Sequence, residues 1–433
     1  MARPLRIGLA GLGTVGVGAF ELLEKNAELI RERTGYRLEV CAVSARTRAK
    51  DRGIDLEGIT WYDNCIEICT DPGIDIVVEL IGGEDHNGPA FQLVQRALQS
   101  KKHVVTANKA LIAHHGAELA VLAEENGVAL AYEAAVAGGI PAVKLVREGL
   151  AANSFRRVYG ILNGTCNYIL STMRDTGRDF ADILAEAQAL GYAEAEPSLD
   201  VDGWDTAHKL AILSSLAFGT KIEFEALSVS GIANVTPQDM AIAAELGYRI
   251  KLLGIAERQS NGSIDQAVRC VLVPKTSPIA SVEGVYNAVV AEGDFVGTVM
   301  VEGAGAGAHA TASAVVADLV DLARGNIVST LGVKADLLQP LQQANRQALK
   351  RAVYMHLNVV NRPGVLSKVT HIMGEHDISI ASCTQRDAQT GVPVSLIMTT
   401  HPACLGRVRD AMEVLDMLDV CTKPCVMMQI EDI

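Results

Sequence analysis

The sequence predicts an α/β protein with a nucleotide-binding domain built on a parallel sheet, a second α/β domain, and a small C-terminal βαββαβ module. Three observations support this prediction. Short apolar runs alternate with helical patterns in the first third of the chain, which is typical of a parallel sheet with helices on both faces. A glycine-rich turn at 11–16 directly follows the first apolar run. Residues 351–433 restart the alternation in the order of a ferredoxin-like module.

Length and composition limit the class of protein. The chain has 433 residues, enough for about three domains of ordinary size. Hydrophobic residues make up 49% and charged residues 21%, which is typical of globular chains and not of disordered ones. The net charge is −13 and no basic run occurs, so we expect no nucleic-acid partner. The chain has neither an apolar run of about 18 residues nor a signal pattern, so we expect a cytoplasmic protein without a membrane span.

The first domain is expected at residues 1–135. Its strands are predicted where short apolar runs occur, at Leu5–Ala10, Arg37–Val43, Ile74–Leu80, His103–Thr106 and Val128–Tyr132. Its helices are predicted where apolar residues recur every three or four positions, at Val15–Arg33, Pro89–Ser100 and Gly116–Asn126. This order is that of a Rossmann-type domain.

The alternation changes after residue 135, and we expect a second α/β domain at 136–310. A helix-rich stretch to about Phe218 separates predicted strands at Asn153–Leu162, Ala267–Val273, Val285–Val290 and Gly297–Glu302. The glycine-rich hinge 303–307 precedes an apolar helix, Thr311–Arg324, and we expect the segment 311–330 to return to the first domain.

A polar linker at 331–350 and a ferredoxin-like module at 351–433 complete the expected organisation. Strands of the module are predicted at Tyr354–Val359, Ile378–Thr384, Pro393–Thr399 and Cys425–Ile430. Helices are predicted at Val365–Glu375 and Leu405–Leu418.

The turn at 11–16 carries a dinucleotide-binding pattern between the first strand and the first helix. Its glycines allow a tight turn, close approach of a pyrophosphate, and close packing of helix on strand. The helix N-terminus then faces the phosphates. We assign Gly11, Gly13, Thr14, Val15 and Gly16 to cofactor binding.

The end of the second strand indicates which dinucleotide binds. An NAD site usually has an acid there for the ribose hydroxyls, but this sequence has Arg46 and Arg48 instead. Because a guanidinium suits a 2′-phosphate, NADP(H) is favoured and Arg46 is a candidate contact. A solvated basic loop is the alternative, and Asp51 could still serve a ribose, so NAD(H) stays open.

Two further segments contain candidate catalytic residues. Lys109 follows the short strand 103–106, where substrates of open α/β sheets bind. Acidic residues crowd the segment 191–205, and Asp205 lies four residues before Lys209, on one face of a predicted helix. By residue type alone, Lys109 can equally be a surface lysine, and Asp205 with Lys209 can equally be an ordinary helix ion pair.

Taken together, the motifs at 11–16, 104–109, 133–141, 160–165 and 191–209 resemble those of the homoserine dehydrogenase family. The resemblance covers residues 1 to about 330. The C-terminal module, with its Asn-Arg-Pro-Gly-Val-Leu segment at 361–366, resembles an ACT domain. No aspartate kinase domain is present, so the resemblance is to the monofunctional form.

The resemblance implies reduction of L-aspartate 4-semialdehyde to L-homoserine by NAD(P)H, in threonine, methionine and isoleucine biosynthesis. Lys209 matches the family's proton donor, and Lys109 matches a second active-site lysine near nicotinamide and substrate. An unperturbed lysine is protonated at neutral pH, so it can donate to the developing alkoxide and stabilise it. The resemblance assigns further residues to the substrate, Glu194 and Asp205, and to the cofactor, Gly191 and Gly307.

The resemblance also implies a monovalent cation, Na⁺ or K⁺, and an oligomer. Glu133, Val136, Gly138 and Ile140 match a cation site in which three ligands are backbone carbonyls. A glycine-rich hinge between domains is equally compatible with this segment. The resemblance makes 136–310 the catalytic and dimerisation domain. The family forms symmetric oligomers, and we expect a homodimer or homotetramer.

The ACT-like module implies a regulatory site. Asn358, Asn361 and Gly364 lie at the turn between its first strand and helix, where such modules bind amino acids. Threonine is the candidate effector. The module can alternatively serve only as a dimerisation surface.

Two rival functions and one rival site depend on single features. Cys166 follows Asn163-Gly164-Thr165 and would be the nucleophile of a cysteine-dependent semialdehyde dehydrogenase, but no basic residue adjoins it. A catalytically inactive amino-acid-sensing module is the other alternative, and the presence of both Lys109 and Lys209 argues against it. The nine cysteines include no Cys-x-x-Cys pair and no histidine cluster, so we expect buried thiols and no zinc site.

Overall fold

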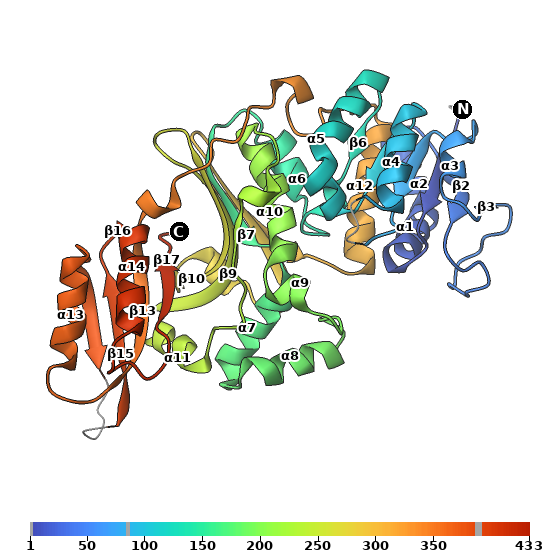
Figure 1. Cartoon of the computed structure of the whole chain (residues 1–433). Helices are drawn as coiled ribbons and strands as arrows, with labels where there is room; N and C mark the ends of the chain where they lie inside the picture. Colours follow the sequence, from blue (N-terminus) through green and yellow to red (C-terminus); the bar gives the residue numbers. More distant parts are fainter. Residues whose placement is uncertain (1–2, 84–86, 386–391) are drawn as a thin grey trace.

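The computed structural model describes residues 3–83, 87–385 and 392–433. Three parts follow one another along the molecule: the nucleotide-binding domain in blue at one end, a central α/β domain, and the C-terminal module in red at the other end (Figure 1). Within the described ranges, no helix is both long and apolar enough to cross a bilayer.

The first domain is built on a six-stranded sheet in which every neighbouring pair is parallel. Its strands, in spatial order, are β3 (Thr60–Tyr62), β2 (Leu38–Ser44), β1 (Leu5–Ala10), β4 (Ile76–Glu79), β5 (His103–Thr106) and β6 (Leu130–Ala131). The strand order reverses between β1 and β4, and in open sheets ligands bind outside the carboxyl ends of the strands at such a point.

Helices cover both faces of this sheet: α1 (Thr14–Lys25), α2 (Ala27–Thr34), α3 (Glu67–Thr70), α4 (Pro89–Gln99) and α5 (Lys109–Asn126). The single helix predicted at 15–33 is two helices that break at Asn26. Helix α5 begins seven residues before its predicted start at 116, because the Asn108 side chain caps it by accepting from the Leu111 amide. Helix α12 (Ala308–Ala323), from much later in the chain, packs against α1 (Figure 1).

The central domain presents an antiparallel sheet. Its strands, in spatial order, are β12 (Gly297–Ala304), β11 (Tyr286–Gly293), β7 (Phe155–Ile161), β9 (Tyr248–Arg258) and β10 (Ile264–Pro274), with β8 (Ser228–Val229) beside β10. Strand β9 was not among the predicted strands, although it forms a long hairpin with β10. The helices of this domain are α6 (Ala142–Lys144), α7 (Gly164–Thr176), α8 (Phe180–Ala189), α9 (Ser198–Val201), α10 (Trp204–Phe218) and α11 (Pro237–Glu245).

The C-terminal module has the predicted β-α-β-β-α-β order. Its elements are β13 (Lys350–Val360), α13 (Val365–Glu375), β14 (Ile380–Gln385), β15 (Pro393–Thr400), α14 (Leu405–Asp416) and β17 (Val426–Ile430), with a short β16 (Ala403–Cys404) before α14. Its sheet order is β17-β13-β15-β14. The predicted fold class is confirmed.

The two last sheets join into one. Strand β17 runs parallel to β10, with Val271 opposite Gln429 and Leu272 opposite Ile430, which makes an 11-stranded sheet. The polar segment 331–350 also lies against the central domain, where Gln343 forms a bridge with Ile264. The C-terminal module is therefore attached by backbone hydrogen bonds as well as by its chain connection.

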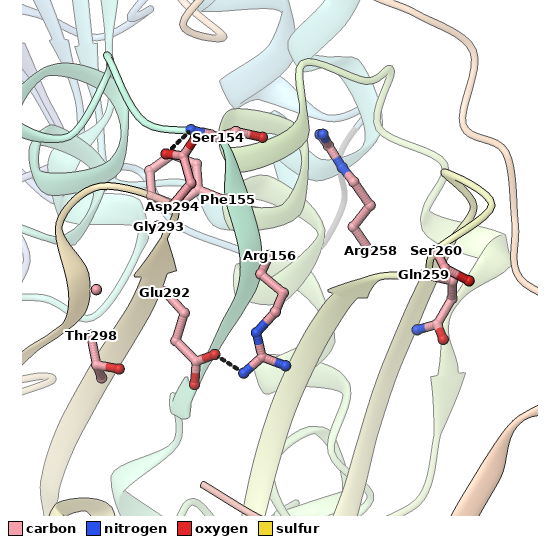
Figure 2. A pocket seen from close by; sticks show the side chains of 11 residues that line it. Ser154, Phe155, Arg156, Arg258, Gln259, Ser260, Glu292, Gly293, Asp294 and Thr298 are labelled. Atoms are coloured by element: carbon pink, nitrogen blue, oxygen red, sulfur yellow. Dashed lines mark hydrogen bonds and ion pairs between the residues drawn. The ribbon is translucent and has the colours of Figure 1, made fainter.

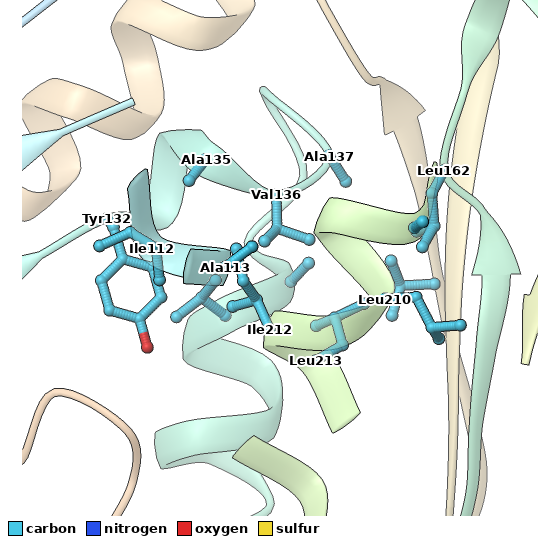
Figure 3. Close-up of a cluster of buried hydrophobic side chains, with 14 of the residues drawn as sticks. Ile112, Ala113, Tyr132, Ala135, Val136, Ala137, Leu162, Leu210, Ile212 and Leu213 are labelled. Atoms are coloured by element: carbon cyan, nitrogen blue, oxygen red, sulfur yellow. The ribbon is translucent and has the colours of Figure 1, made fainter. Parts of the chain in front are cut away.

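A buried apolar cluster holds α5 against α10. Figure 3 shows Ile112 and Ala113 of α5 close to Ile212 and Leu213 of α10, and all four side chains are at most 2% exposed. Leu162, at the end of β7, closes the cluster and is fully buried. Because interiors are closely packed, this cluster fixes the two helices relative to each other.

Candidate active site

Two lysine side chains from two domains converge on one carboxylate. Lys109 is the first residue of α5, in the nucleotide-binding domain, and its Nζ lies 2.8 Å from Asp205 Oδ1. Lys209, one turn after Asp205 on α10, places its Nζ 2.8 Å from the other oxygen, Oδ2. The structure therefore brings together three of the four residues that we expected at the catalytic and substrate site.

The charges of this group support one another. Burial of Asp205 opposes its ionisation, but the ammonium groups of Lys209 and Lys109 outweigh burial and hold the pKa of the carboxyl well below its usual value. Asp205 is therefore an anion at neutral pH. Lys209 also donates to the backbone carbonyl of Leu162 at 2.7 Å, so the position of its ammonium is fixed by two acceptors.

Asn163 supports the carboxylate from a third element. Its side-chain oxygen accepts from the Cys166 amide and caps α7, while its Nδ2 donates to Asp205 Oδ2 at 2.8 Å and to Asp200 Oδ1 at 2.7 Å. Burial and the neighbouring Asp205 charge raise the pKa of Asp200. Sequence reasoning assigned no role to Asn163 or Asp200, although the position of Asn163 just before a helix was a capping signal.

An aromatic group borders the lysines. His208 stacks on Phe224 with ring centroids 4.5 Å apart, and His114 lies 4.7 Å from the same ring. Burial, followed by the nearby His114 and Lys109, lowers the pKa of His208 to about 4, so this imidazole is neutral at pH 7. No spacing in the sequence pointed to these residues.

The structure does not bring Glu194 to this carboxylate. Glu194 is exposed on the loop between α8 and α9, and in the described part of the chain its carboxylate forms no hydrogen bond or ion pair. Gly191 lies on the same loop at φ 76°, and Gly307 precedes α12 at φ 111°. Both glycines have open space around the position of a Cβ.

The turn at 11–16 fits a dinucleotide. A Cβ on Gly11 would lie 2.2 Å from the Leu80 carbonyl oxygen, and one on Gly16 would lie 2.0 Å from the Gly11 oxygen, so both positions require glycine. Gly13 has open space around it, and among the described residues no side chain caps the N-terminus of α1. The first amides of α1, which begins with Thr14 and Val15, are therefore suited to a pyrophosphate.

Basic residues gather beside this turn. Arg46 is exposed just after β2, and the guanidinium groups of Arg48 and Arg52 lie 5.8 and 5.6 Å from the centre of the Trp61 ring. Arg52 also donates from Nε to the Leu12 carbonyl at 3.2 Å. Sequence reasoning missed Arg52, because its approach to the glycine turn depends on the path of the loop after β2.

The expected cation ligands lie on one buried segment. Both oxygens of the Glu133 carboxylate accept backbone amides, from Val143 at 2.9 Å and from Lys144 at 2.8 Å. Burial, followed by the neighbouring Asp318, raises the pKa of Glu133 to about 7. A Cβ on Gly138 would lie 2.3 Å from the Gly305 oxygen, so the segment with Val136, Gly138 and Ile140 packs tightly against the end of β12. The Glu133 side chain therefore orders the start of α6.

The environment of Cys166 does not favour a nucleophile. Cys166 is fully buried, and its Sγ lies 3.1 Å from the Asp200 carbonyl oxygen. Burial, followed by the charge of Asp200, raises the pKa of this thiol well above its usual value. All nine cysteines are free thiols, and the described residues contain no cluster of three metal-binding side chains.

Two of the three expected regulatory residues, Asn361 and Gly364, lie in the turn between β13 and α13, and Asn358 lies two residues before the end of β13. The Asn358 carbonyl accepts from the Thr422 amide at 2.8 Å. Gln385 donates to the Asn361 side chain at 3.1 Å. Gly364, at φ 87°, precedes α13, and no side chain of the described residues caps that helix.

A wide hollow lies on the central sheet, away from the lysines. Figure 2 shows Arg156 and Glu292, which form an ion pair, and Arg258 around a cavity of about 720 Å³. None of the residues that converge on Asp205 lines this cavity. It is therefore not part of the candidate active site.

Three family models match this chain. Family models match residues 11–133 (homoserine dehydrogenase, NAD binding domain), 141–320 (homoserine dehydrogenase) and 357–416 (ACT domain). Curated homoserine dehydrogenases of Pseudomonas aeruginosa and Neisseria gonorrhoeae are 45% and 40% identical, with 100% of this chain covered and 100% and 99% of theirs.

Solved structures agree with these matches. The homoserine dehydrogenase of Thiobacillus denitrificans has a TM-score of 0.93 at 44% identity, with 99% of each chain covered. That of S. aureus has a TM-score of 0.79 at 32% identity, with 100% of each chain covered. The paired lysines on Asp205, the dinucleotide turn and these likenesses lead to one conclusion: the chain is an oxidoreductase that belongs to the homoserine dehydrogenase family.

Proposed function

We propose that the chain reduces L-aspartate 4-semialdehyde to L-homoserine with NAD(P)H. The two ammonium groups held on Asp205 assist this step by stabilising and protonating the alkoxide that forms. The observation that carries this proposal is the Lys109–Asp205–Lys209 array at 2.8 Å on each side, beside the carboxyl ends of the nucleotide-binding strands. Fixed positive charge where an alkoxide develops is the arrangement that carbonyl reduction requires.

NAD(P)H, when bound, supplies the hydride. Lys209 is the proton donor to the alkoxide oxygen, because Leu162 and Asp205 fix its ammonium while leaving one N–H free to donate. Lys109 stabilises the same oxygen by its charge and marks the nicotinamide side, since it starts a helix of the nucleotide-binding domain. Asp205, together with Glu194 after a movement of its loop, offers carboxylate to the substrate's ammonium.

NADP(H) is the proposed coenzyme. Arg46, Arg48 and Arg52 stand beside the glycine turn, where a 2′-phosphate would extend from the adenosine ribose. A solved archaeal homoserine dehydrogenase, 26% identical over 74% of this chain, is in complex with NADPH.

The remaining assignments are proposed on the same basis. The carbonyls of Val136, Gly138 and Ile140 hold a monovalent cation, Na⁺ or K⁺. The turn with Asn358, Asn361 and Gly364 binds threonine and inhibits the enzyme. The chain acts in the cytoplasm as a homodimer or homotetramer, in the biosynthesis of threonine, methionine and isoleucine.

The test is the initial rate of NADPH and NADH oxidation with L-aspartate 4-semialdehyde, with and without L-threonine. We expect faster turnover with NADPH and a lower rate with threonine. No turnover with either coenzyme would contradict the proposed reaction. Equal rates with NADPH and NADH would contradict the coenzyme preference. A rate that threonine does not change would contradict the proposed regulation.

A further inference from the structure

A second polar cavity lies between the central domain and the C-terminal module. Its volume is about 310 Å³, at the small end of ligand sites in proteins. On one side it is lined by β8, β10 and the segment 230–235, and on the other by β17 and the start of α14. It contains neither the lysines of the active site nor the residues of the β13–α13 turn.

Charges of both signs line this cavity. Asp265 is 1% exposed, and its carboxylate lies 2.8 Å from Arg346 Nε and 3.7 Å from Arg269 Nη1. Arg269 Nη2 also lies 3.3 Å from Glu431 Oε1, so the two guanidinium groups face two carboxylates and the charges around the cavity balance. Ser228, Ser230 and Asn234 add exposed hydroxyl and amide groups at the opening. A ligand with one carboxylate and one ammonium would match this set.

Two buried polar atoms of lining residues have no protein partner. Arg269 Nε and Gln429 Oε1 are buried, and neither finds a hydrogen bond among the residues that the structure describes. Gln429 is 9% exposed, and its neighbours Val426, Met427 and Met428 supply an apolar surface. Buried polar groups in native proteins usually have a partner, so these two atoms indicate a missing one.

One wall of the cavity is in contact with the helix of the active site. Gly231 lies against the turn between α9 and α10 so closely that a Cβ there would be 1.9 Å from the Val201 carbonyl oxygen. Ile232 donates to that same oxygen at 2.9 Å, and a Cβ on Gly203 lies 3.0 Å from Val268 of β10. Asp205 follows two residues after Gly203, so any displacement of segment 230–232 moves the start of α10.

We propose that this cavity binds a small zwitterionic ligand, an L-α-amino acid, with its carboxylate on Arg269 or Arg346, its ammonium on Asp265, and an apolar side chain on β17. Such a ligand contacts both the C-terminal module and segment 230–235. Occupancy therefore changes the position of Asp205 through the α9–α10 turn. The inference adds an effector site to the proposed regulation, and binding is measurable without turnover, so its failure is distinct from failure of the proposed reaction.

The first measurement is a thermal-shift screen of the full chain against each of the common protein amino acids except threonine, for which the β13–α13 turn is the proposed site, followed by calorimetry of those that raise Tm. Asn234→Trp fills the opening, and Ala233→Trp is its matched control, because Ala233 is exposed and does not line the cavity. We expect at least one amino acid to bind the wild type and the control, and to bind Asn234→Trp at least tenfold more weakly. Binding by Asn361→Ala should be unchanged.

Hydrogen exchange on the wild type keeps the test independent of variant folding. Slower exchange at 228–235 and 426–429 with the bound amino acid is the expected result. Absence of binding by all of the amino acids screened would overturn the proposal. So would undiminished binding by Asn234→Trp, loss of binding in Asn361→Ala alone, or protection confined to the β13–α13 turn.

Discussion

The ammonium of Lys109 lies 2.8 Å from the carboxylate of Asp205, and the two residues belong to different domains. Lys109 begins a helix of the nucleotide-binding domain, and Asp205 lies in the first turn of a helix of the central domain. The pair therefore ties the cofactor side of the site to the substrate side. Lys209 neutralises the second oxygen of the same carboxylate, so the array carries one net positive charge.

Replacement of Lys209 by methionine should abolish most catalysis without unfolding the protein. Proton transfer by a positioned group contributes about 10²–10⁴-fold to a rate, so we expect kcat to fall by that factor. KM for the coenzyme should change little. Lys221→Met, at an exposed site on the same domain, is the matched control in steady-state assays. Turnover within threefold of wild type in Lys209→Met would show that another group donates the proton.

Replacement of Asp205 by asparagine should cost stability that depends on pH. The variant leaves two ammonium groups facing a neutral amide, a loss of up to about 3–5 kcal/mol for a buried pair. Because the pKa of Asp205 is lower in the folded state than in the unfolded chain, its contribution is complete above about pH 4 and declines as pH falls through the folded-state pKa. Thermal melts should therefore show a Tm difference from wild type that shrinks as the pH is lowered below about 4. A difference independent of pH would contradict this account of the charge.

Asn163 performs two functions that substitutions can separate. Its oxygen caps α7, and its Nδ2 donates to Asp205 and Asp200. Serine retains an oxygen that can cap α7 but cannot donate to both Asp205 and Asp200. Alanine loses the cap and both donated hydrogen bonds. We expect both variants to lose activity, while alanine alone is destabilised by about 1 kcal/mol. Urea unfolding and kcat/KM measure the two effects, and a fully active serine variant would limit Asn163 to capping.

Arg52→Gln should weaken NADPH binding selectively. If the guanidinium over Trp61 contacts the 2′-phosphate, its removal raises KM for NADPH about tenfold and leaves KM for NADH unchanged. Arg33→Gln, on the exposed face of α2, is the control for general charge effects. Equal changes for both coenzymes would assign Arg52 to shaping the Leu12 turn instead.

Cys166→Ser should remain active. The thiol is buried, its pKa is raised, and it donates to a backbone carbonyl that a hydroxyl can also reach. We expect kcat within about twofold of wild type and no loss of activity with iodoacetamide at neutral pH. Inactivation of the wild type, with protection by the aldehyde substrate, would revive the cysteine-dependent alternative.

The residues that the sequence revealed are those whose signal is local. The glycine pattern at 11–16 marks the turn, and the spacing of Asp205 and Lys209 places both on one helix face, while their roles came from the family resemblance. His208 and Arg52 act through partners far away in the chain, and no local pattern marks them; for Asn163 the local pattern indicates only the helix cap. Glu194 shows the opposite case, since its motif is clear but its carboxylate stays exposed and unpaired among the described residues.

The same distinction applies to the fold. The ends of β1 and β5 followed from apolar runs, while the start of α5 depended on the Asn108 cap. The parallel pairing of β17 with β10 joins strands that are distant in the sequence and belong to different domains. Neither strand alone indicates that partner, because each has a strand pattern that several neighbours would satisfy.

The parallel pairing of β10 with β17 has a consequence for engineering the chain. A truncation that removed the C-terminal module would leave the backbone amides and carbonyls of β10 at 271–272 without their partners and expose a bare sheet edge. Such an edge pairs readily with other chains, so the shortened protein would tend to aggregate. Grafting another sensor in place of this module would require a donor whose terminal strand completes the same ladder in the same direction.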